Sequence, residues 1–185
     1  MMRVYSLEEI RHCFSRSTDF NEIFDMFQSA ISQGVDELEH YRPLFWNHSL
    51  SPDEICLFGE KLADQFPDVA FDVYLWLASV FEVTCSSDDN YERAFVYYRK
   101  AAEVRPDHPD PYLDVCDCYD PDLNIPPVAA LIDFVKTGAE QVPQPGPLFT
   151  RLSRLYEHAG DPAQSEAYRQ KAEEAGGRRG SNPAG

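Results

Sequence analysis

Apolar residues recur at spacings of three and four along most of the chain, a pattern typical of helices that bury one face. We find no alternation of apolar and polar residues closed by Asn-Gly or Asp-Gly, which would indicate β-hairpins. The pattern therefore predicts an all-α protein. The predicted helices lie near residues 6–16, 19–33, 35–46, 52–66, 69–85, 90–105, 109–119, 125–141, 146–159 and 162–175.

Start signals support several of these boundaries. Three segments, Ser6-Leu-Glu-Glu9, Asp19-Phe-Asn-Glu22 and Ser51-Pro-Asp-Glu54, have the spacing of a capping box, in which each side chain accepts a hydrogen bond from the other residue's backbone N–H. Pro52 stands at the first helical position, where its missing N–H leaves no hydrogen bond unmade. Each of the three segments therefore predicts the start of a helix.

The same apolar stripes occur more than once. One stripe is shared by Tyr74, Leu77, Ala78 and Phe81, by Tyr112, Val115, Cys116 and Tyr119, and by Phe149, Leu152, Ser153 and Tyr156. A second stripe ends in proline and is shared by Ile55, Gly59, Leu62 and Pro67, by Ala94, Tyr98, Ala101 and Pro106, and by Leu131, Val135, Gly138 and Pro143. A helix pair thus recurs every 37 to 39 residues. Since one pair is too thin to bury its own apolar face, we expect the pairs to stack as an α-solenoid.

Two segments resemble the tetratricopeptide repeat (TPR) family. Residues 91–106 (YERAFVYYRKAAEVRP) resemble the second helix of that repeat, and residues 149–161 (FTRLSRLYEHAGD) resemble the first helix with its turn. The resemblance covers residues 69–175 well and residues 35–67 weakly. The repeats here are longer than the family's usual length of about 34 residues, so the array is degenerate. The resemblance implies antiparallel helix pairs in a right-handed superhelix.

The repeat pattern predicts three parts of the chain. Residues 1–34 are expected to form an N-terminal helical cap. Residues 35–175 are expected to form the repeat array, and the polar, Gly-rich residues 176–185 are expected to be a disordered tail. The predicted repeats lie at about 35–67, 69–106, 109–143 and 146–175.

Composition narrows the choice of partner and compartment. The 185 residues carry a net charge of −16, which disfavours nucleic acids and anionic membranes because Lys and Arg must neutralise their phosphates. The longest uncharged apolar run, residues 73–81, is too short to span a bilayer, and the first residues lack the apolar core of a signal peptide. Five scattered cysteines, an odd number, indicate free thiols. We therefore expect a soluble cytoplasmic protein.

Candidate chemistry is sparse. Cys116 and Cys118 would point to nearly opposite sides of a helix and could not hold one metal ion. Residues 120–124 begin like a calcium loop, but Ile125 replaces the expected glycine and Leu131 the final glutamate. No nucleophile elbow, zinc-protease motif or phosphate loop is present. We expect no enzyme activity, no catalytic residue, no metal site and no cofactor.

The TPR resemblance implies a set of binding residues. In that family the first helix of each pair lines a concave groove, and the residues beside each stripe here are Trp76, Ser79, Asp114, Asp117, Arg151 and Arg154, to which Asp110 and Asp120 add carboxylates. One interpretation is an acidic groove, flanked by an aromatic residue, for a basic or amphipathic peptide or protein. The other is that the aspartates pair with the arginines of the next repeat. The sequence leaves both open.

Several functions fit such a chain. The leading hypothesis is a non-enzymatic adaptor that binds a protein or peptide. A role in gripping the C-terminus of heat-shock chaperones is not expected, because the TPR proteins that do so use Lys, Arg and Asn where this chain has Asp. Alternatives are a small acidic chaperone resembling type III secretion chaperones, or an assembly subunit with an aromatic patch at residues 41–46. A last alternative is a catalytic or regulatory N-terminal piece built on Arg11-His12-Cys13. The partner and the oligomeric state are not specified by the sequence.

Overall fold

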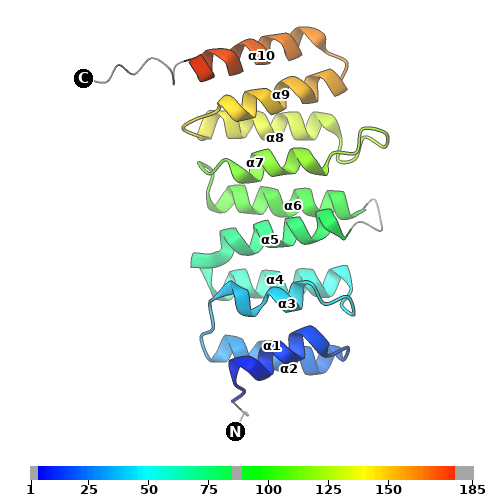
Figure 1. Ribbon diagram of the computed structural model, residues 1–185, viewed down its shortest axis with the longest axis vertical. Coiled ribbons are helices and arrows are strands. Elements are labelled where there is room, and N and C mark those ends of the chain that lie inside the picture. The colour runs from blue at the N-terminus through cyan, green and yellow to red at the C-terminus, as the bar shows by residue number, and fades with distance from the viewer. Residues whose placement is uncertain (1–3, 85–88, 178–185) are drawn as a thin grey trace, which may run out of the picture. The chain divides into compact units, whose positions relative to one another are not determined.

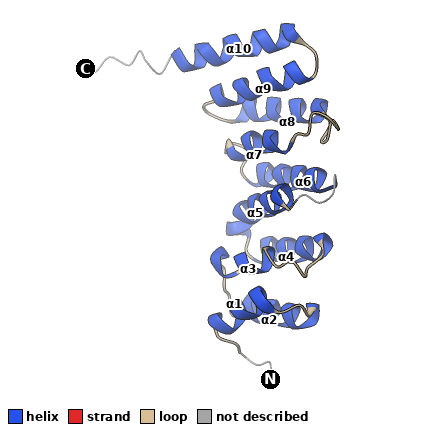
Figure 2. Ribbon diagram, turned by 45° about the vertical axis from the view of Figure 1, so that its right-hand side comes forward, coloured by secondary structure: helices blue, strands red, loops and turns tan. Residues whose placement is uncertain are grey.

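Helices account for nearly all the regular structure of the protein. The structure, a computed structural model, describes residues 4–84 and 89–177. In these ranges it contains ten α-helices and three short 3-10 helices and no β-strand (Figures 1 and 2). The chain divides into two compact units, Met1–Val83 and Thr84–Gly185, called here the N-terminal unit and the C-terminal unit. The prediction of an all-α fold is confirmed.

The N-terminal unit consists of five α-helices and two 3-10 turns. They are α1 (Leu7–Arg16), α2 (Phe20–Ser32), η1 (Leu38–His40), α3 (Arg42–Phe45), α4 (Pro52–Gln65), η2 (Pro67–Val69) and α5 (Ala70–Val83). Two of the three predicted capping boxes are present: at α1 the Glu9 carboxylate accepts from the Ser6 backbone N–H at 2.8 Å, and at α4 Glu54 accepts from Ser51 at 2.7 Å. At α2 the Asp19 carboxylate accepts from the Asn21 and Glu22 backbone N–H groups, but the Glu22 carboxylate accepts from the Ser17 hydroxyl, so the third box is not formed.

Aromatic side chains fill the core of the N-terminal unit. The Phe27 ring lies 4.9 Å from the Phe58 ring and 5.8 Å from the Tyr41 ring, measured between centroids. All three side chains are inaccessible to solvent, and so is Phe14. The buried Tyr41 hydroxyl is satisfied because it donates to the Val35 carbonyl oxygen at 2.7 Å. Helices α1 and α2 therefore share one core with α3 and α4.

One predicted helix of this unit is wrong. A helix over residues 35–46 was expected, but the structure has only the turn η1 and the single helical turn of α3. Pro43 explains the difference, because a proline inside that helix would remove one backbone hydrogen bond and clash with the preceding turn. In the structure Pro43 lies in the first turn of α3, where neither problem arises.

The C-terminal unit also consists of five α-helices. They are α6 (Asp89–Val104), α7 (Asp110–Asp114), which continues as the 3-10 turn η3 (Val115–Cys118), α8 (Val128–Gln141), α9 (Gly146–His158) and α10 (Pro162–Gly177). Within the unit they follow one another in chain order (Figure 1), and α9 packs against both α8 and α10. Gly176 and Gly177, predicted to belong to the disordered tail, are part of α10. The rest of that predicted tail lies outside the described residues.

The connection before α8 departs from the predicted pattern. Helices over 109–119 and 125–141 were expected, but α7 ends at Asp114 and α8 begins at Val128. The helix that starts at Asp110 continues as the 3-10 turn η3 to Cys118, so the main difference is the later start of α8. Pro126 and Pro127 explain it, because a residue that precedes a proline is disfavoured in the helical conformation. Instead, the Asp120 backbone N–H donates to the Ile125 carbonyl at 2.8 Å and closes a loop.

Two glycines of the predicted stripes lie where helices meet. Gly59 on α4 and Gly138 on α8 are both buried, and each lies where a neighbouring helix leaves no room for a side chain. A Cβ atom at Gly59 would lie 2.4 Å from the Leu77 side chain on α5, and one at Gly138 would lie 2.4 Å from the Tyr112 ring on α7. The glycines of the predicted stripe thus permit close helix contact.

Candidate functional site

A surface hollow of about 290 Å³ in the N-terminal unit contains two of the predicted binding residues, Trp76 and Ser79. We call it the tryptophan pocket. Its lining comes from η1, from α3 and the residue after it, and from α5: Glu39, Arg42, Phe45, Trp46, Trp76, Ser79 and Val80. The pocket therefore combines the predicted groove residues of α5 with the aromatic patch that was predicted separately at residues 41–46.

The two indole side chains of the pocket are held in different ways. Phe45 is buried, and its ring meets Trp76 edge to face, with centroids 6.3 Å apart and ring planes 82° apart. This contact fixes Trp76 against the core. Trp46 follows the last residue of α3 and is 43% exposed. One tryptophan is thus partly packed, whereas the other is open to a ligand.

Charged side chains surround the pocket. A Glu39 carboxylate oxygen lies 3.7 Å from an Arg42 guanidinium nitrogen, and both side chains are more than half exposed, so this ion pair contributes little to stability.

Further carboxylates are close to the lining residues in the chain. Asp36 and Glu37 precede Glu39. Tyr41 is the phenol next to them, and burial raises its pKa, with the two carboxylates adding to the effect. On α5, exposed Asp72 lies one turn before Trp76. The lining thus holds one side chain of each charge, Glu39 and Arg42, and the carboxylates close to it in the chain outnumber the cations.

The C-terminal unit contains the predicted acidic residues, and one of them has a partner. The Arg151 guanidinium binds the Asp117 carboxylate through two contacts, Nη1 to Oδ1 at 3.0 Å and Nη2 to Oδ2 at 3.2 Å. Asp117 lies in η3 and Arg151 in α9, so this bidentate pair joins two of the predicted repeats. It agrees with the ion-pair interpretation at Asp117.

The other predicted residues of this unit are not gathered around one hollow. Asp110 starts α7, and its carboxylate lies 3.6 Å from the His108 imidazole. The Asp120 carboxylate accepts from the backbone N–H groups of Asp122 and Leu123, at 2.9 and 3.1 Å, and thereby stabilises its own loop. Asp114 and Arg154 are exposed. Their contribution to binding stays a prediction.

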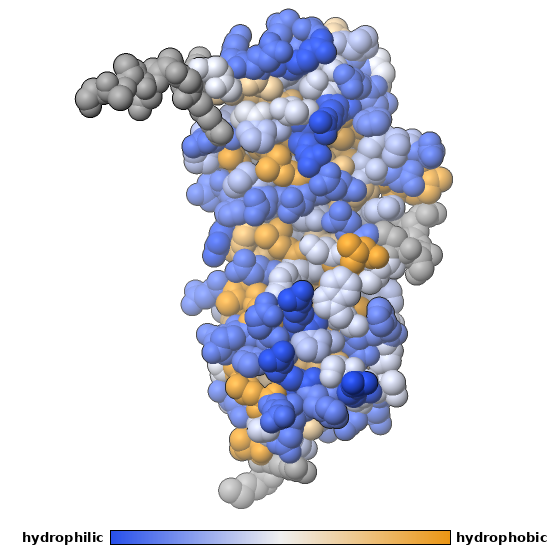
Figure 3. Space-filling model, in the orientation of Figure 1, coloured by the Kyte–Doolittle hydropathy of each residue, from blue (hydrophilic) through white to orange (hydrophobic). Residues whose placement is uncertain are grey.

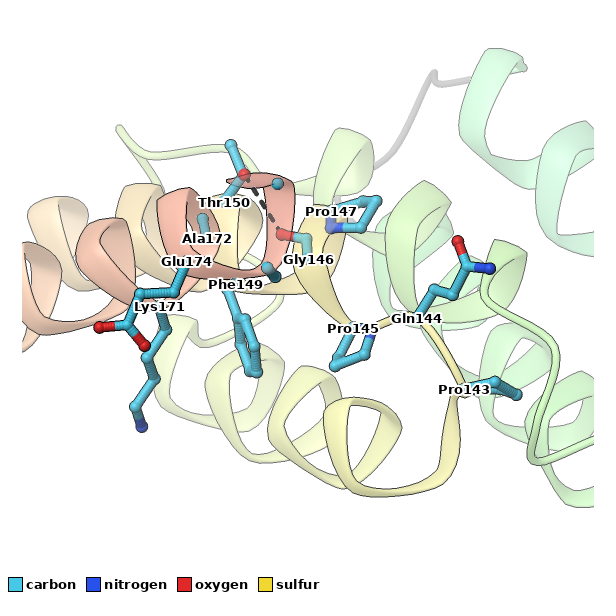
Figure 4. A pocket seen from close by; sticks show the side chains of 12 residues that line it. Pro143, Gln144, Pro145, Gly146, Pro147, Phe149, Thr150, Lys171, Ala172 and Glu174 are labelled. Atoms are coloured by element: carbon cyan, nitrogen blue, oxygen red, sulfur yellow. Dashed lines mark hydrogen bonds between the residues drawn. The ribbon is translucent and has the colours of Figure 1, made fainter. Parts of the chain in front are cut away.

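A larger hollow, of about 720 Å³, lies beside the connection between α8 and α9 (Figure 4). Figure 4 shows the rings of Pro143 and Pro145 on this connection and the ring of Pro147 at the start of α9, while Lys171 and Glu174 come from α10. No feature of the sequence singled out this place. Its lining has one side chain of each charge at the edge and no described cluster of reactive groups.

Two thiols of the described residues, those of Cys13 and Cys116, are poor nucleophiles. Burial raises the pKa of Cys13 to about 11 and that of Cys116 to about 12, so both stay protonated at neutral pH. Cys13 is the thiol of the Arg11-His12-Cys13 cluster, and the structure gives no support to a reactive centre there. Among the described residues no group of three His, Cys, Asp or Glu side chains is arranged to hold a metal ion.

The visible surface is mixed in polarity. Figure 3 shows a face that is largely hydrophilic, with small separate hydrophobic patches. Within the described ranges, no helix combines the length and the apolarity that crossing a membrane requires.

Comparisons with known proteins give matches in structure alone. No family model and no curated protein matches the sequence. A crystal structure of MamA matches 97% of this chain and 94% of its own, with a TM-score of 0.57 and 14% identity. A second MamA crystal structure matches 97% of this chain and 99% of its own, with a TM-score of 0.55 and 14% identity. These matches show a TPR-like helical repeat fold.

Proposed function

We propose that the chain is a non-enzymatic protein-interaction module that binds a basic or amphipathic segment of a partner protein. The observation that carries this proposal is the tryptophan pocket. Its lining contains both tryptophans of the chain. Tryptophan is enriched among the residues that dominate binding energy at protein interfaces, because it buries a large rigid area. A repeat fold offers such a pocket on a stacked, preformed framework.

The charge of the chain supports a basic partner. With 32 acidic and 16 basic side chains, the protein attracts cationic segments and speeds their association. In this proposal Asp110, Asp114 and Asp120 contribute to the attraction, and Arg154 lies at its edge. The pair between Asp117 and Arg151 serves mainly to join helices, because both charges already have a partner.

Affinity capture with matched variants tests the proposal. Wild-type protein, the double variant Trp46→Ala/Trp76→Ala and the control Leu123→Ala are each used as bait in lysate of the source organism. Leu123 is 52% exposed in the C-terminal unit and does not line the pocket. We expect the same partner with wild type and control, and its loss with the double variant.

Far-UV circular dichroism of each bait establishes that the loss does not come from unfolding. Capture of the same proteins in equal amounts by a folded double variant would contradict the proposal.

A further inference from the structure

We infer that the tryptophan pocket takes the cationic head of a single Lys or Arg side chain from the partner, held between indole surfaces and carboxylates. The inference rests on the proposed function and names the chemistry that the pocket recognises. The proposed function would be met equally well by a partner that places an apolar side chain in the pocket. The inference goes further because it requires a cation there. The pocket must therefore distinguish a cation from an apolar group of the same shape.

The size of the pocket favours one side chain as its occupant. A hollow of about 290 Å³ lies at the lower limit of the pockets that enclose small molecules. It is too small for the apolar face of a helix, which needs a longer groove for its successive anchors. Trp76 is already fixed by the Phe45 ring, so seating a side chain against it costs little additional ordering.

The side chains of the pocket favour a cation. The face of an indole ring attracts ammonium and guanidinium groups more strongly than other aromatic side chains do. Glu39 supplies a carboxylate in the lining, and its contact with Arg42 is long and exposed, so an incoming cation can take it over. Asp72 adds a second carboxylate one turn from Trp76. An apolar anchor would use none of these charges.

The charge of the whole N-terminal unit points the same way. Residues 1–83 contain 15 acidic and 5 basic side chains. Arg42 is the single basic side chain in the described lining. A basic segment would therefore reach the pocket through a negative potential, and its cationic side chain would then meet the aromatic surface.

Tryptophan fluorescence tests the inference directly, because the chain has two tryptophans and both line the pocket. The full-length protein is titrated with a short synthetic peptide in which two lysines flank a leucine. The matched peptide carries norleucine in place of each lysine, which keeps the aliphatic chain and removes the charge. We expect the lysine peptide to change the emission and the norleucine peptide to have no effect at the same concentration. We also expect the affinity to fall as salt is raised.

Substitutions separate a cationic contact from an apolar one. Trp76→Leu and Trp46→Leu each retain an apolar surface and leave one tryptophan as the reporter. Each is expected to weaken binding of the lysine peptide about 3- to 30-fold, measured by anisotropy of labelled peptide. Glu39→Gln should weaken it about 3- to 10-fold. The matched control is Glu103→Gln, an exposed carboxylate on α6, which should change affinity less than 2-fold.

The outcomes distinguish this inference from the proposed function. Binding of the norleucine peptide as tight as that of the lysine peptide would overturn the cationic pocket and leave an interaction module intact. If neither peptide changes the emission, the inference is wrong. If partner capture is in addition unaffected by the Trp46→Ala/Trp76→Ala variant, the proposed function fails as well. Should a tryptophan variant unfold, the inference is still tested by comparing the two peptides on the wild-type protein and by the affinity of the Glu39→Gln variant.

Discussion

Single residues decide how the predicted acidic groove is interpreted. The sequence left two possibilities for its aspartates, and the structure separates them residue by residue: Asp117 forms a bidentate pair with Arg151, and Asp120 stabilises its own loop. The pairing partner is Arg151 and not Arg154, three residues further along α9. Sequence offsets identify which residues lie on one helix face, but they cannot give the shift between neighbouring helices that decides which charges meet.

The Asp117–Arg151 pair should contribute modestly to stability. The two side chains are 54% and 28% exposed, so solvent screens much of their attraction. We expect Asp117→Asn and Arg151→Gln each to lower the free energy of unfolding by less than about 1 kcal/mol. A double-mutant cycle in urea should show coupling between these two positions. The control cycle on Asp117 and Arg154 should show none, and stronger coupling in the control would contradict the observed pairing.

The Cys13 thiol gives a pH-dependent prediction. Burial raises its native pKa from 9.0 to about 11, so above pH 9 the unfolded chain loses this proton more readily than the native protein. The stability that the protonated thiol contributes is complete below that pH and is lost as pH rises towards 11. We expect the unfolding free energy of wild type to fall faster than that of Cys13→Ala between about pH 8 and pH 11. Parallel pH profiles would contradict the raised pKa.

The tryptophan pocket was partly predictable at the same scale. Trp76 and Ser79 follow from their offsets beside the packing stripe, and Trp46 belongs to a visible aromatic cluster. Nothing in the sequence indicates that these two sets share one hollow, because that requires α3 and α5 to come together. Glu39 and Arg42 gave no signal of their own, since their role depends on that same contact.

Helices with strong local signals were the predictable elements. The two capping boxes that form each start a helix at the predicted residue, because the hydrogen bonds involved lie within four residues of the chain. The errors fall where prolines compete with an apolar pattern, at Pro43 and in the loop before α8. At Pro43 the neighbouring Tyr41, Leu44 and Phe45 are buried as the pattern predicts, but the helix is reduced to the single turn that begins there. In the loop before α8 the apolar Leu123 is exposed, so the apolar pattern there was misleading as well.

Close packing between helices gives a prediction at this scale. In Gly138→Ala the new methyl group would lie 2.4 Å from the Tyr112 ring, which α7 holds in the core, so the helices must move apart. We expect a loss of about 1–3 kcal/mol in unfolding free energy. Gly176→Ala on α10 is the matched control, because its Cβ would meet no atom within 4 Å.

Alanine also favours the helix over glycine, so the control should be neutral or slightly stabilising. Urea unfolding of both variants measures the difference. Equal stability of the two would mean that α7 and α8 do not approach each other as closely as the structure indicates.

For the whole molecule, the repeat period predicted the fold class, and the domain bounds drawn from it stay a prediction. The chain divides into its two compact units between residues 83 and 84, inside the repeat predicted at 69–106. A period shows that helix pairs are alike. It carries no information on how strongly each helix pair packs against the next, because that strength depends on the side chains of both pairs.

The division gives a prediction for a truncated chain. Deleting residues 146–185 removes α9 and α10 and uncovers the face of α8 that packs on α9. Since repeat proteins are stabilised by contacts between neighbours, the loss should be confined to the C-terminal unit. Both tryptophans lie in the N-terminal unit, so fluorescence follows that unit alone, whereas circular dichroism follows all helices. We expect the urea midpoint from fluorescence to change little and the midpoint from circular dichroism to fall. A parallel fall of both would mean that the chain unfolds as one cooperative body, and the nearest-neighbour description of its stability would then be wrong.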